Sequence, residues 1–376
     1  MIYLDNAATT IEKPASVIQA IHRSLTSHLG NPSRGTYIAA QQSMQQVEDA
    51  RETVKQFFNA HHYECAFSMN ATESLNIAIK GLVPPHSHVL TTSWEHNAVL
   101  RPLYQLDKQG VTFDVIPSQK VTGALCYDEM ASLLKENTKV MICNIVSNVT
   151  GNVMDLPRIK DFCQQHHLTL ILDCSQAAGV IPVDLSDDVV AAACFTGHKS
   201  LLGPMGVGGM CIRHDISIEP LITGGDGIQS FSHEAPKTLP ERIEAGTLNV
   251  PNIIGLAAGI NYVNQHLELR QQEEQWTRAI RNRLLAMDHI EVYGDGTSHS
   301  IVAFNIKGVD SAITSMLLDE RAQIMTRSGY HCAPLMHQFL GTGKQGAVRL
   351  SLSMMTTKSE IERTCQVIQQ LSMEAE

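Results

Sequence analysis

The segment CFTGHKSLLGPMGVGGM, residues 194–210, joins the end of an apolar stretch to a run of glycines and places one lysine, Lys199, between them. The apolar stretch, VVAAACF at 189–195, has the length and composition of a buried strand. A lysine directly after such a strand lies at the edge of the sheet where ligands of open parallel sheets bind. The alternative is a surface lysine whose amine stays in water. The segment therefore indicates an α/β sheet with a candidate functional lysine at its edge.

Five further apolar runs extend this pattern along the chain. They are SHVLTTS at 87–93, VTFDVIP at 111–117, KVMICNIVS at 139–147, LTLILDC at 168–174 and VGGMCIR at 207–213. Amphipathic segments such as DLPRIKDFCQQHH, residues 155–167, lie between the runs, as helices do between the strands of a parallel sheet. The predicted fold class is α/β, with a mostly parallel sheet in a large domain.

The segment 224–252 is rich in Gly, Pro and polar residues, so it predicts a long loop or a domain boundary. From Ile253 a helical pattern runs to about Met287, and patterns of strand, helix, strand and helix follow it. We expect a large domain over residues 15–252 and a smaller α+β domain formed by residues 1–14 and 253–376.

The chain has 376 residues and a formal net charge of −10 without a basic cluster, so we expect neither nucleic acid nor an anionic membrane as a partner. Its nine cysteines are scattered and form no C-x-x-C pair, which is typical of a reduced cytosolic protein. The first residues show no signal-peptide pattern, and no apolar run is long enough to span a bilayer. These features predict a cytoplasmic protein.

Polar side chains follow several predicted strands at the edge where ligands would bind. Asp173 comes directly after LTLIL, where a buried carboxylate needs a cation or strong donors; otherwise it is a helix N-cap or part of a structural ion pair. Taken alone, His96 and Asn148 are equally typical of turns or satisfied core groups. The other polar residues at this edge are Gln176, Thr196 and His198.

A candidate anion site precedes these residues. SMNATESLNIAIKGL, residues 68–82, predicts a helix that begins after Asn70, with Glu73 in the position of a capping-box acid. The free N–H groups around Ala71 and Thr72 could bind a phosphate, although an ordinary capped helix has the same pattern.

These groups together match one cofactor. A lysine amine in an apolar pocket loses basicity and can form a Schiff base with an aldehyde. Pyridoxal 5'-phosphate has an aldehyde, a phosphate and a pyridine nitrogen that takes an acidic partner. The sequence therefore predicts a site for pyridoxal 5'-phosphate, and no metal site.

Ordered motifs along nearly the whole chain support this prediction. They are YLDNAATT, NPSRG, NATESLN, EHNAVL, VSNVTG, LDCSQAAG, TGHKSLLGPMGVG, IEAGTLN, TRSGYHCAP and VRLSLS. The chain resembles the class V aminotransferase-like enzymes of fold type I, and within them the group II cysteine desulfurases and selenocysteine lyases. The resemblance implies a large domain that binds pyridoxal phosphate and a small domain that carries a catalytic cysteine loop.

The resemblance also implies roles for the residues. Lys199 would form the Schiff base, Asp173 would bind the pyridinium nitrogen, and His96 would stack on the ring. Asn148 and Gln176 would lie near the phenolic oxygen and the substrate. The phosphate would be bound by Thr72, Thr196 and His198.

The relatives are homodimers, which implies that Thr247 reaches the phosphate held by the partner subunit. Ala71 stands where relatives commonly have a hydroxyl residue, so only its backbone N–H can serve the phosphate. Arg34, in NPSRG, corresponds to a residue that lines the site in the family.

Cys332 distinguishes between the reactions that this cofactor supports. In TRSGYHCAPLMHQ, residues 326–338, it lies beside His331 and near Arg327, and positive neighbours with partial exposure favour the thiolate. A buried inert thiol is the expectation for the other eight cysteines. The resemblance implies that Cys332 takes sulfur from L-cysteine as a persulfide and that alanine is released, with Arg349 holding the substrate carboxylate. His331 could donate a proton or only tune the thiol.

Several alternatives remain open. The chain could be an aminotransferase or lyase in which Cys332 is incidental, a selenocysteine lyase that takes L-selenocysteine, or an inactive fold used for binding. The acceptor of the sulfur could be an iron-sulfur scaffold, a tRNA-modifying protein or another carrier. The cysteine loop has no long insertion, which suggests a less mobile thiol that needs an activating partner.

Overall fold

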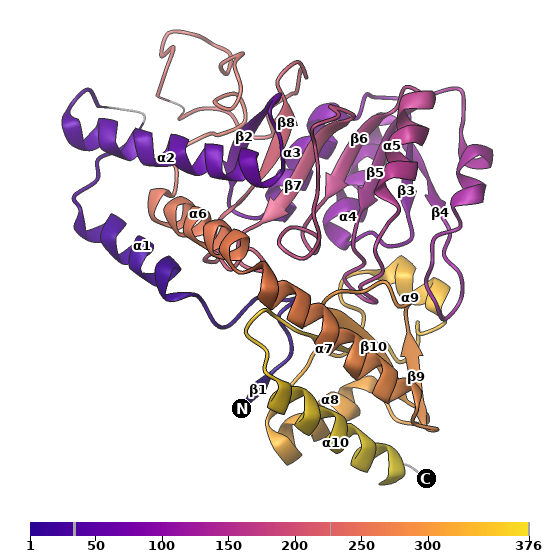
Figure 1. The fold of residues 1–376 in the computed structure, drawn as a ribbon. Helices are drawn as coiled ribbons and strands as arrows, with labels where there is room; N and C mark the ends of the chain where they lie inside the picture. The colour runs from indigo at the N-terminus through magenta and orange to yellow at the C-terminus, as the bar shows by residue number, and fades with distance from the viewer. Residues whose placement is uncertain (33–34, 226, 375–376) are drawn as a thin grey trace.

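The computed structural model describes residues 1–376 except 33–34, 226 and 375–376. Seven strands of the described residues form a central sheet in the order β2-β8-β7-β6-β5-β3-β4 (Figure 1). The strands are β2 Tyr63–Ser68, β3 His88–Thr92, β4 Thr112–Ile116, β5 Thr138–Asn144, β6 Thr169–Asp173, β7 Val190–Thr196 and β8 Gly208–Arg213. β8 is antiparallel to both neighbours and the other pairs are parallel, which confirms the predicted mostly parallel sheet.

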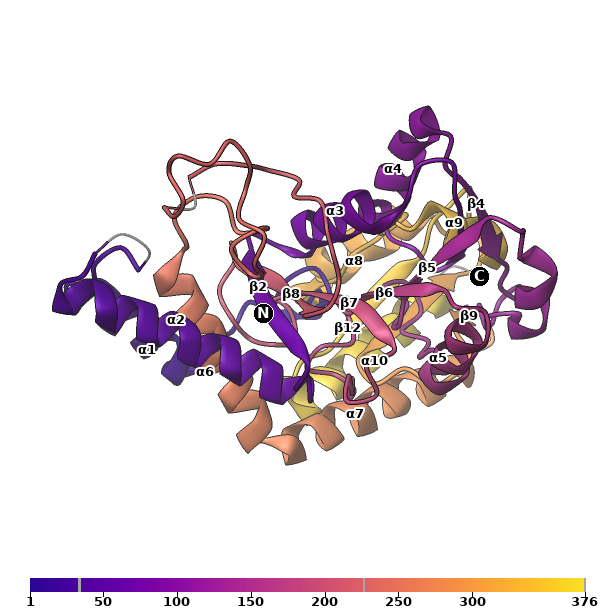
Figure 2. The same cartoon turned by 90° about the horizontal axis from the view of Figure 1, so that it is seen from above.

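Alternate side chains of the central strands pack into separate cores on the two faces of the sheet. In β6, Leu170 and Leu172 belong to one core and Ile171 belongs to the other. Helices α3 (Ala71–Leu82) and α4 (Asn97–Leu106) cover one face, and α5 (Leu156–Gln165) covers the other, as Figure 2 shows from above. Burial on both faces explains why these strands are almost continuously apolar.

Four further helices follow: α1 (Ala15–Thr26), α2 (Ile38–Phe57), α6 (Val250–Gln265) and α7 (Leu267–Leu285). Helix α2 packs against β2, α6 packs against α2 and α1, and α7 extends toward the smaller sheet (Figure 1). The prediction of one continuous helix from Ile253 to Met287 is wrong, because His266 has φ −128° and ψ 49°, outside the helical region. The His266 ring stacks on Tyr262 with 4.0 Å between ring centroids, and α7 leaves in a new direction (Figure 1).

A second, smaller unit surrounds an antiparallel sheet in the order β12-β10-β9. Its strands are β9 Ile290–Tyr293, β10 Ile301–Ile306 and β12 Val348–Ser351, with a parallel pair of β1 Ile2–Tyr3 and β11 Ile324–Met325 beside them. Its helices are α8 Ser311–Ala322, α9 Pro334–Leu340 and α10 Lys358–Glu374. One core joins Ile280 of α7, Phe304 of β10 and Leu371 of α10. The residue bounds of the two predicted domains stay a prediction.

Four strands of the described residues, β1, β2, β9 and β11, were not predicted from the sequence, nor were helices α1, α2 and α9 or two short 3-10 helices. Strand β2 includes the polar Glu64 and β9 has only four residues, so neither gives a clear apolar run. The short helices are the 3-10 segments η1 Asp107–Gln109 and η2 Tyr127–Leu133. Between β8 and α6 the described residues form neither helix nor strand, in agreement with the predicted loop over most of 224–252. No helix in the described ranges is both long and apolar enough to cross a membrane.

Candidate active site

One pocket lies at the carboxyl ends of β3, β5, β6 and β7. Its lining residues are Asn70, Ala71, Thr72, Leu75, His96, Ala98, Asn144, Asn148, Asp173, Ser175, Gln176, Thr196, His198 and Lys199. Every residue predicted to bind the cofactor, except Thr247, therefore belongs to one pocket of a single chain. The strand-end rule for parallel sheets accounts for this grouping.

Lys199 lies three residues beyond the end of β7 and lines the pocket. The pKa of its amine is lowered to about 8, mainly by burial; Asp173 opposes this shift, and Arg349 and Arg327 contribute to it. A substantial fraction of the amine is thus neutral near pH 8 and can act as a nucleophile. The alternative of an ordinary surface lysine does not fit this environment.

Asp173 is the last residue of β6 and is 3% exposed. Its Oδ1 accepts a hydrogen bond from the Ser175 N–H at 2.8 Å, so the carboxylate also caps the turn that follows the strand. This bond uses one oxygen of the Asp173 carboxylate. The charge of the same carboxylate raises the pKa values of Lys199 and His96. The capping role and a role in the pocket are therefore compatible.

His96 is the N-cap of α4, and its Nδ1 accepts the Ala98 N–H at 3.0 Å. The pKa of the imidazole is lowered to about 4, mainly by burial; Asp173 opposes this shift and Lys199 contributes to it. The ring is therefore neutral, with its proton on Nε2. His96 combines the local capping role considered from the sequence with a place in the pocket.

The candidate phosphate end of the pocket lies at the start of α3. Asn70 Oδ1 accepts the Glu73 N–H at 3.0 Å, as predicted. Glu73 Oε2 accepts the Met69 N–H at 2.6 Å, whereas in a capping box it would accept the N–H of the N-cap residue, Asn70. Thr196 Oγ1 and His198 Nδ1 are buried and have no hydrogen-bond partner in the described part of the chain. Burial lowers the pKa of His198 to about 4, so its ring is neutral.

The unpaired atoms fit a bound ligand that carries an anion at one end. Burying a polar atom without a partner costs about 1–3 kcal/mol, and a phosphate would accept from Thr196 and from the Nδ1–H tautomer of His198. Asn144 Oδ1 and Asn148 Oδ1, which line the same pocket, are also buried without a partner in the resolved positions. The donors and acceptors of the pocket therefore suit pyridoxal phosphate.

The loop that carries Cys332 is attached to the rim of this pocket. The Asn97 N–H donates to the Cys332 carbonyl at 2.7 Å, and Asn148 Nδ2 donates to the His331 carbonyl at 2.7 Å. His331 and Cys332 have φ of 49° and 56°, a left-handed conformation that costs energy for residues other than glycine. The two hydrogen bonds hold this strained turn beside His96.

Cys332 is exposed, whereas Cys126 is half-buried and the other cysteines are buried; all nine are free thiols. Burial raises the pKa of Cys163 to about 12 and that of Cys143 well above its usual value. The prediction of buried thiols is thus wrong in part for Cys126, which lies at the start of a short helix. Among the nine, Cys332 combines exposure with a place beside the pocket.

His331 is neutral in this arrangement. Burial is the main cause that lowers its pKa to about 2, and burial lowers the pKa of His337 to about 4. The two rings stack with centroids 5.6 Å apart, and His331 Nε2 lies 3.3 Å from the Arg327 carbonyl oxygen. His331 therefore supplies no positive charge to the thiol, which favours its role in shaping the loop.

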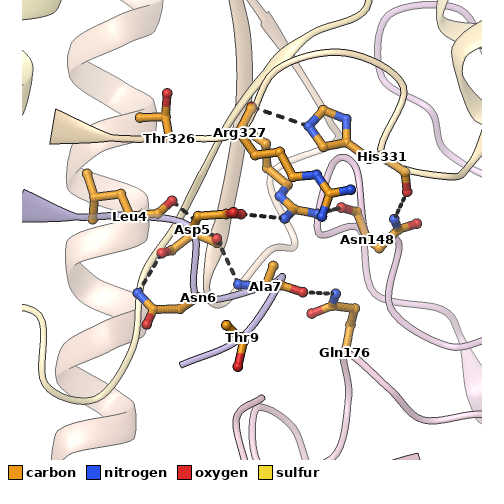
Figure 3. Close-up of polar contacts among 12 residues, drawn as sticks. Leu4, Asp5, Asn6, Ala7, Thr9, Asn148, Gln176, Thr326, Arg327 and His331 are labelled. Atoms are coloured by element: carbon orange, nitrogen blue, oxygen red, sulfur yellow. Dashed lines mark hydrogen bonds and ion pairs between the residues drawn. The ribbon is translucent and has the colours of Figure 1, made fainter. Parts of the chain in front are cut away.

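Arg349, on β12, is buried rather than on the strand surface, at 1% exposure. Its Nη2 forms an ion pair with Asp5 Oδ1 at 2.8 Å, and its Nη1 donates to the Asn148 carbonyl at 2.8 Å (Figure 3). It does not line the pocket but contacts Asn148, which does. Its predicted role toward a substrate carboxylate stays a prediction.

Of the two remaining predicted residues, the structure describes one. Thr247 lines a separate hollow together with Met69, Ile222 and Glu244. Arg34 lies outside the described residues. No three His, Cys, Asp or Glu side chains gather into a metal site in the part of the chain that the structure covers.

Sequence reasoning missed Asn144 and Ser175, which line the pocket, and Asp5, which holds Arg349. Asn144 is the last residue of β5, so the strand-end rule could have found it. Ser175 follows Asp173 in the quoted motif. Asp5 carries no such signal, because its partner is 344 residues away.

Comparisons with known proteins agree with this geometry. The model of the class-V aminotransferase family matches residues 2–364. A probable cysteine desulfurase of Methanothermobacter thermautotrophicus is 30% identical over 380 residues, which cover 99% of this chain and 94% of that protein.

Two solved structures are similar over the whole fold. The apo cysteine desulfurase of Thermococcus onnurineus has a TM-score of 0.91 at 29% identity, covering 99% of this chain and 95% of its own. The cysteine desulfurase CsdA of Escherichia coli has a TM-score of 0.85 at 26% identity, covering 99% and 94%. A pocket with a lysine at the sheet edge and a family match over nearly every residue lead to one conclusion: this chain belongs to the class-V aminotransferase family.

Proposed function

We propose that the protein is a pyridoxal-phosphate-dependent cysteine desulfurase that converts L-cysteine to L-alanine and leaves a persulfide on Cys332. The observation that carries this proposal is the attachment of the Cys332 loop to the pocket, through Asn97 on one side and Asn148 on the other. The names of the similar proteins support the same activity.

The pocket residues would hold the cofactor as follows. Asp173 would pair with the pyridine nitrogen and His96 would face the ring. Asn148 and Gln176 would lie near the phenolic oxygen, and Gln176 is already oriented by its Nε2 donating to the Ala7 carbonyl at 2.9 Å. The phosphate would take the backbone N–H groups at Ala71 and Thr72 and the unpaired donors of Thr196 and His198.

Bound there, pyridoxal phosphate supplies an aldehyde that captures the substrate amine and an electron sink for the α-carbon. Lys199, with its lowered pKa, holds and moves the proton at the α-carbon. Arg349 binds the substrate carboxylate, for which its planar fork of donors is suited.

The Cys332 thiolate attacks the sulfur of the substrate. The new S–S bond forms as the C–S bond of L-cysteine breaks; the electron pair of that bond stays on the β-carbon, which then takes a proton. The substrate carbon is reduced and its sulfur is oxidised to the outer atom of the persulfide, so no external oxidant is needed.

The test is single-turnover release of alanine from L-cysteine by the purified protein loaded with cofactor. Cys332→Ala and Lys199→Ala should both abolish it, while Cys126→Ala, which removes a half-buried thiol elsewhere, should keep it. Release of alanine by Cys332→Ala at the native rate would instead identify an aminotransferase or lyase with an incidental cysteine.

We further propose that the working form is a homodimer, in which Thr247 reaches the phosphate of the partner subunit. Thr247 lies outside the pocket of its own chain, in a hollow with Met69 and Ile222. Met69, Met205 and Ile222 are 61%, 62% and 54% exposed, and a second copy would cover this apolar surface. Sedimentation of the loaded protein should show a dimer, and Thr247→Val should weaken cofactor binding. A fully loaded monomer would contradict the proposal.

The persulfide sulfur would pass to an acceptor protein in the cytoplasm, for example in iron-sulfur cluster assembly. Because two hydrogen bonds fix the Cys332 turn, we expect slow multiple turnover until an acceptor or an added thiol removes the sulfur. Full turnover without either would contradict this expectation. Competition between L-cysteine and L-selenocysteine would show whether the protein acts as a selenocysteine lyase.

A further inference from the structure

Asp5 and Arg349 form a junction of three chain segments. Arg349 comes from β12. Asp5 follows β1 at the start of the chain, and Asn148 follows β5 at the pocket; both are labelled in Figure 3. Arg349 Nη2 contacts Asp5 Oδ1 at 2.8 Å and Nη1 contacts the Asn148 carbonyl at 2.8 Å. Its Nε is buried and has no partner in the described part of the chain. One donor of this buried guanidinium is therefore unused by the described residues, next to Asn148, which does line the pocket.

The backbone around Asp5 is held firmly against β12. The Ser351 N–H donates to the Leu4 carbonyl at 2.7 Å, and the Asn6 N–H donates to the Ser351 carbonyl at 3.3 Å. The Ala7 N–H donates to Ser351 Oγ at 2.9 Å, and Asn6 Nδ2 donates to the Ser351 carbonyl at 3.0 Å. Asp5 thus has a fixed backbone on each side, so its carboxylate is a rigid acceptor for Arg349.

A guanidinium has five N–H donors in one plane, and two fixed acceptors on its terminal nitrogens determine the direction of the remaining ones. With Nη1 on the Asn148 carbonyl and one Nη2 hydrogen on Asp5, the directions of the remaining donors, Nε–H and the second Nη2 hydrogen, are fixed. Charge-assisted hydrogen bonds from a guanidinium fork to a carboxylate are among the strong ones. Without Asp5 the plane could rotate about its bonds, and the fork would lose its direction.

We propose that Asp5 is a positioning residue for substrate binding: it holds the Arg349 guanidinium so that its Nε side faces the α-carboxylate of the amino acid. The inference rests on the proposed function and deepens it. Nothing in the resemblance to the family assigns a role to Asp5.

The local charges agree with this role. Burial and the charge of Arg327 disfavour the charged form of Arg349, and Asp5 favours it through its charge and its hydrogen bond. Two guanidiniums and one carboxylate leave a single positive charge, which suits a ligand with one carboxylate at this end.

A competing arrangement predicts the opposite result. If Asp5 occupied the place of the substrate carboxylate, its removal would free Arg349 and tighten substrate binding. If Asp5 orients Arg349 instead, its removal weakens binding. The sign of the change in KM distinguishes the two.

The experiment compares Asp5→Asn with the native loaded protein in alanine release at varied L-cysteine. KM should rise about tenfold, the value of one charge-assisted hydrogen bond, with kcat changed less than about twofold. Asp319→Asn is the matched control, because Asp319 is exposed on α8, and its KM should stay native. An unchanged or lowered KM in Asp5→Asn would overturn the proposal.

A double-mutant cycle separates positioning from a general effect on the fold. In an Arg349→Gln background, Asp5→Asn should add no further rise in KM, because the group that it orients is absent. Additive effects would show that Asp5 acts independently of Arg349 and would overturn the proposal. Asp5→Glu keeps the charge, and thus the fold, but moves the carboxylate by one methylene. Its KM should also rise, and a native KM would count against the proposal.

Equilibrium binding provides a readout that does not depend on turnover. Asp5→Asn should bind L-alanine more weakly than the native protein does, but should bind ethylamine, which lacks the carboxylate, equally well. Equal loss for both ligands would overturn the proposal. If the native protein released no alanine from L-cysteine, the proposed function would fail, while this comparison would still test Asp5.

Discussion

Replacing Glu95 with glutamine is expected to remove a pH-dependent loss of stability. Glu95 precedes His96 and is fully buried. Its Oε1 accepts from Thr92 Oγ1 at 2.6 Å and from the Asn144 N–H at 3.0 Å, whereas Oε2 has no partner in the resolved ranges. Its pKa is raised from 4.5 to about 8, mainly by burial; the hydrogen bonds from Thr92 and Asn144 lower it and the charge of Asp173 contributes to the rise. The folded protein therefore keeps this carboxyl protonated at neutral pH.

The sign and size of the effect follow from this pKa. The unfolded chain ionises Glu95 above pH 4.5, while the folded chain holds the proton until about pH 8. The stabilisation is thus fully present below the unfolded pKa and is lost as the pH rises through the folded pKa, by up to about 1.4 kcal/mol per pH unit. Between pH 6 and pH 8 the free energy of unfolding should fall by about 2 kcal/mol because of this group.

The assay is urea unfolding of the native protein and of Glu95→Gln at pH 6 and pH 8, followed by circular dichroism. Glutamine keeps the shape and the accepting oxygen but does not titrate, so the variant should gain about 2 kcal/mol relative to the native protein between the two pH values. Glu136→Gln, at an exposed glutamate, should show no such gain. An equal difference between native and Glu95→Gln at both pH values would refute the reasoning.

Three further predictions test other parts of the account. Burial lowers the pKa of Lys199 to about 8, so capture of pyridoxal phosphate by the apo protein should become faster as the pH rises and should level off above pH 8. Absorbance follows the capture, and a rate that is constant from pH 6 to 9 would contradict this prediction. Brief alkylation of the native protein should modify Cys332 first and Cys126 more slowly in peptide mass spectra, and equal labelling of buried thiols would show that the core is open. Arg51→Met should cost about 3–5 kcal/mol in urea unfolding, because it leaves Glu244 buried without its bidentate partner; a loss below about 1 kcal/mol would refute that pairing.

The central strands could be predicted because burial on both faces imposes a continuous apolar run. Strand β6 is the clearest case, with Leu170, Ile171 and Leu172 divided between two cores. The antiparallel direction of β8 could not be predicted, since a strand buried on both faces has the same composition in either direction. The break between α6 and α7 was missed because it depends on the non-helical backbone angles of His266, which the helical pattern of the sequence does not reveal.

The pocket was predictable because one topological rule places strand ends together, so Asp173, Thr196 and Lys199 could be grouped from their positions after apolar runs. The neutral state of His331 was not, since it depends on burial beside His337. The contact of Asp5 with Arg349 could not be predicted either, because it requires β1 to pair with β11 and Asp5 to bridge to Ser351 of β12.

The most direct test of the central claim is the mass of the peptide that contains Cys332 after one turnover with L-cysteine, without added thiol. This peptide should gain one sulfur atom in an amount equal to the alanine released, and peptides with the other cysteines should gain none. Release of alanine without added sulfur on Cys332 would show that Cys332 does not take the sulfur.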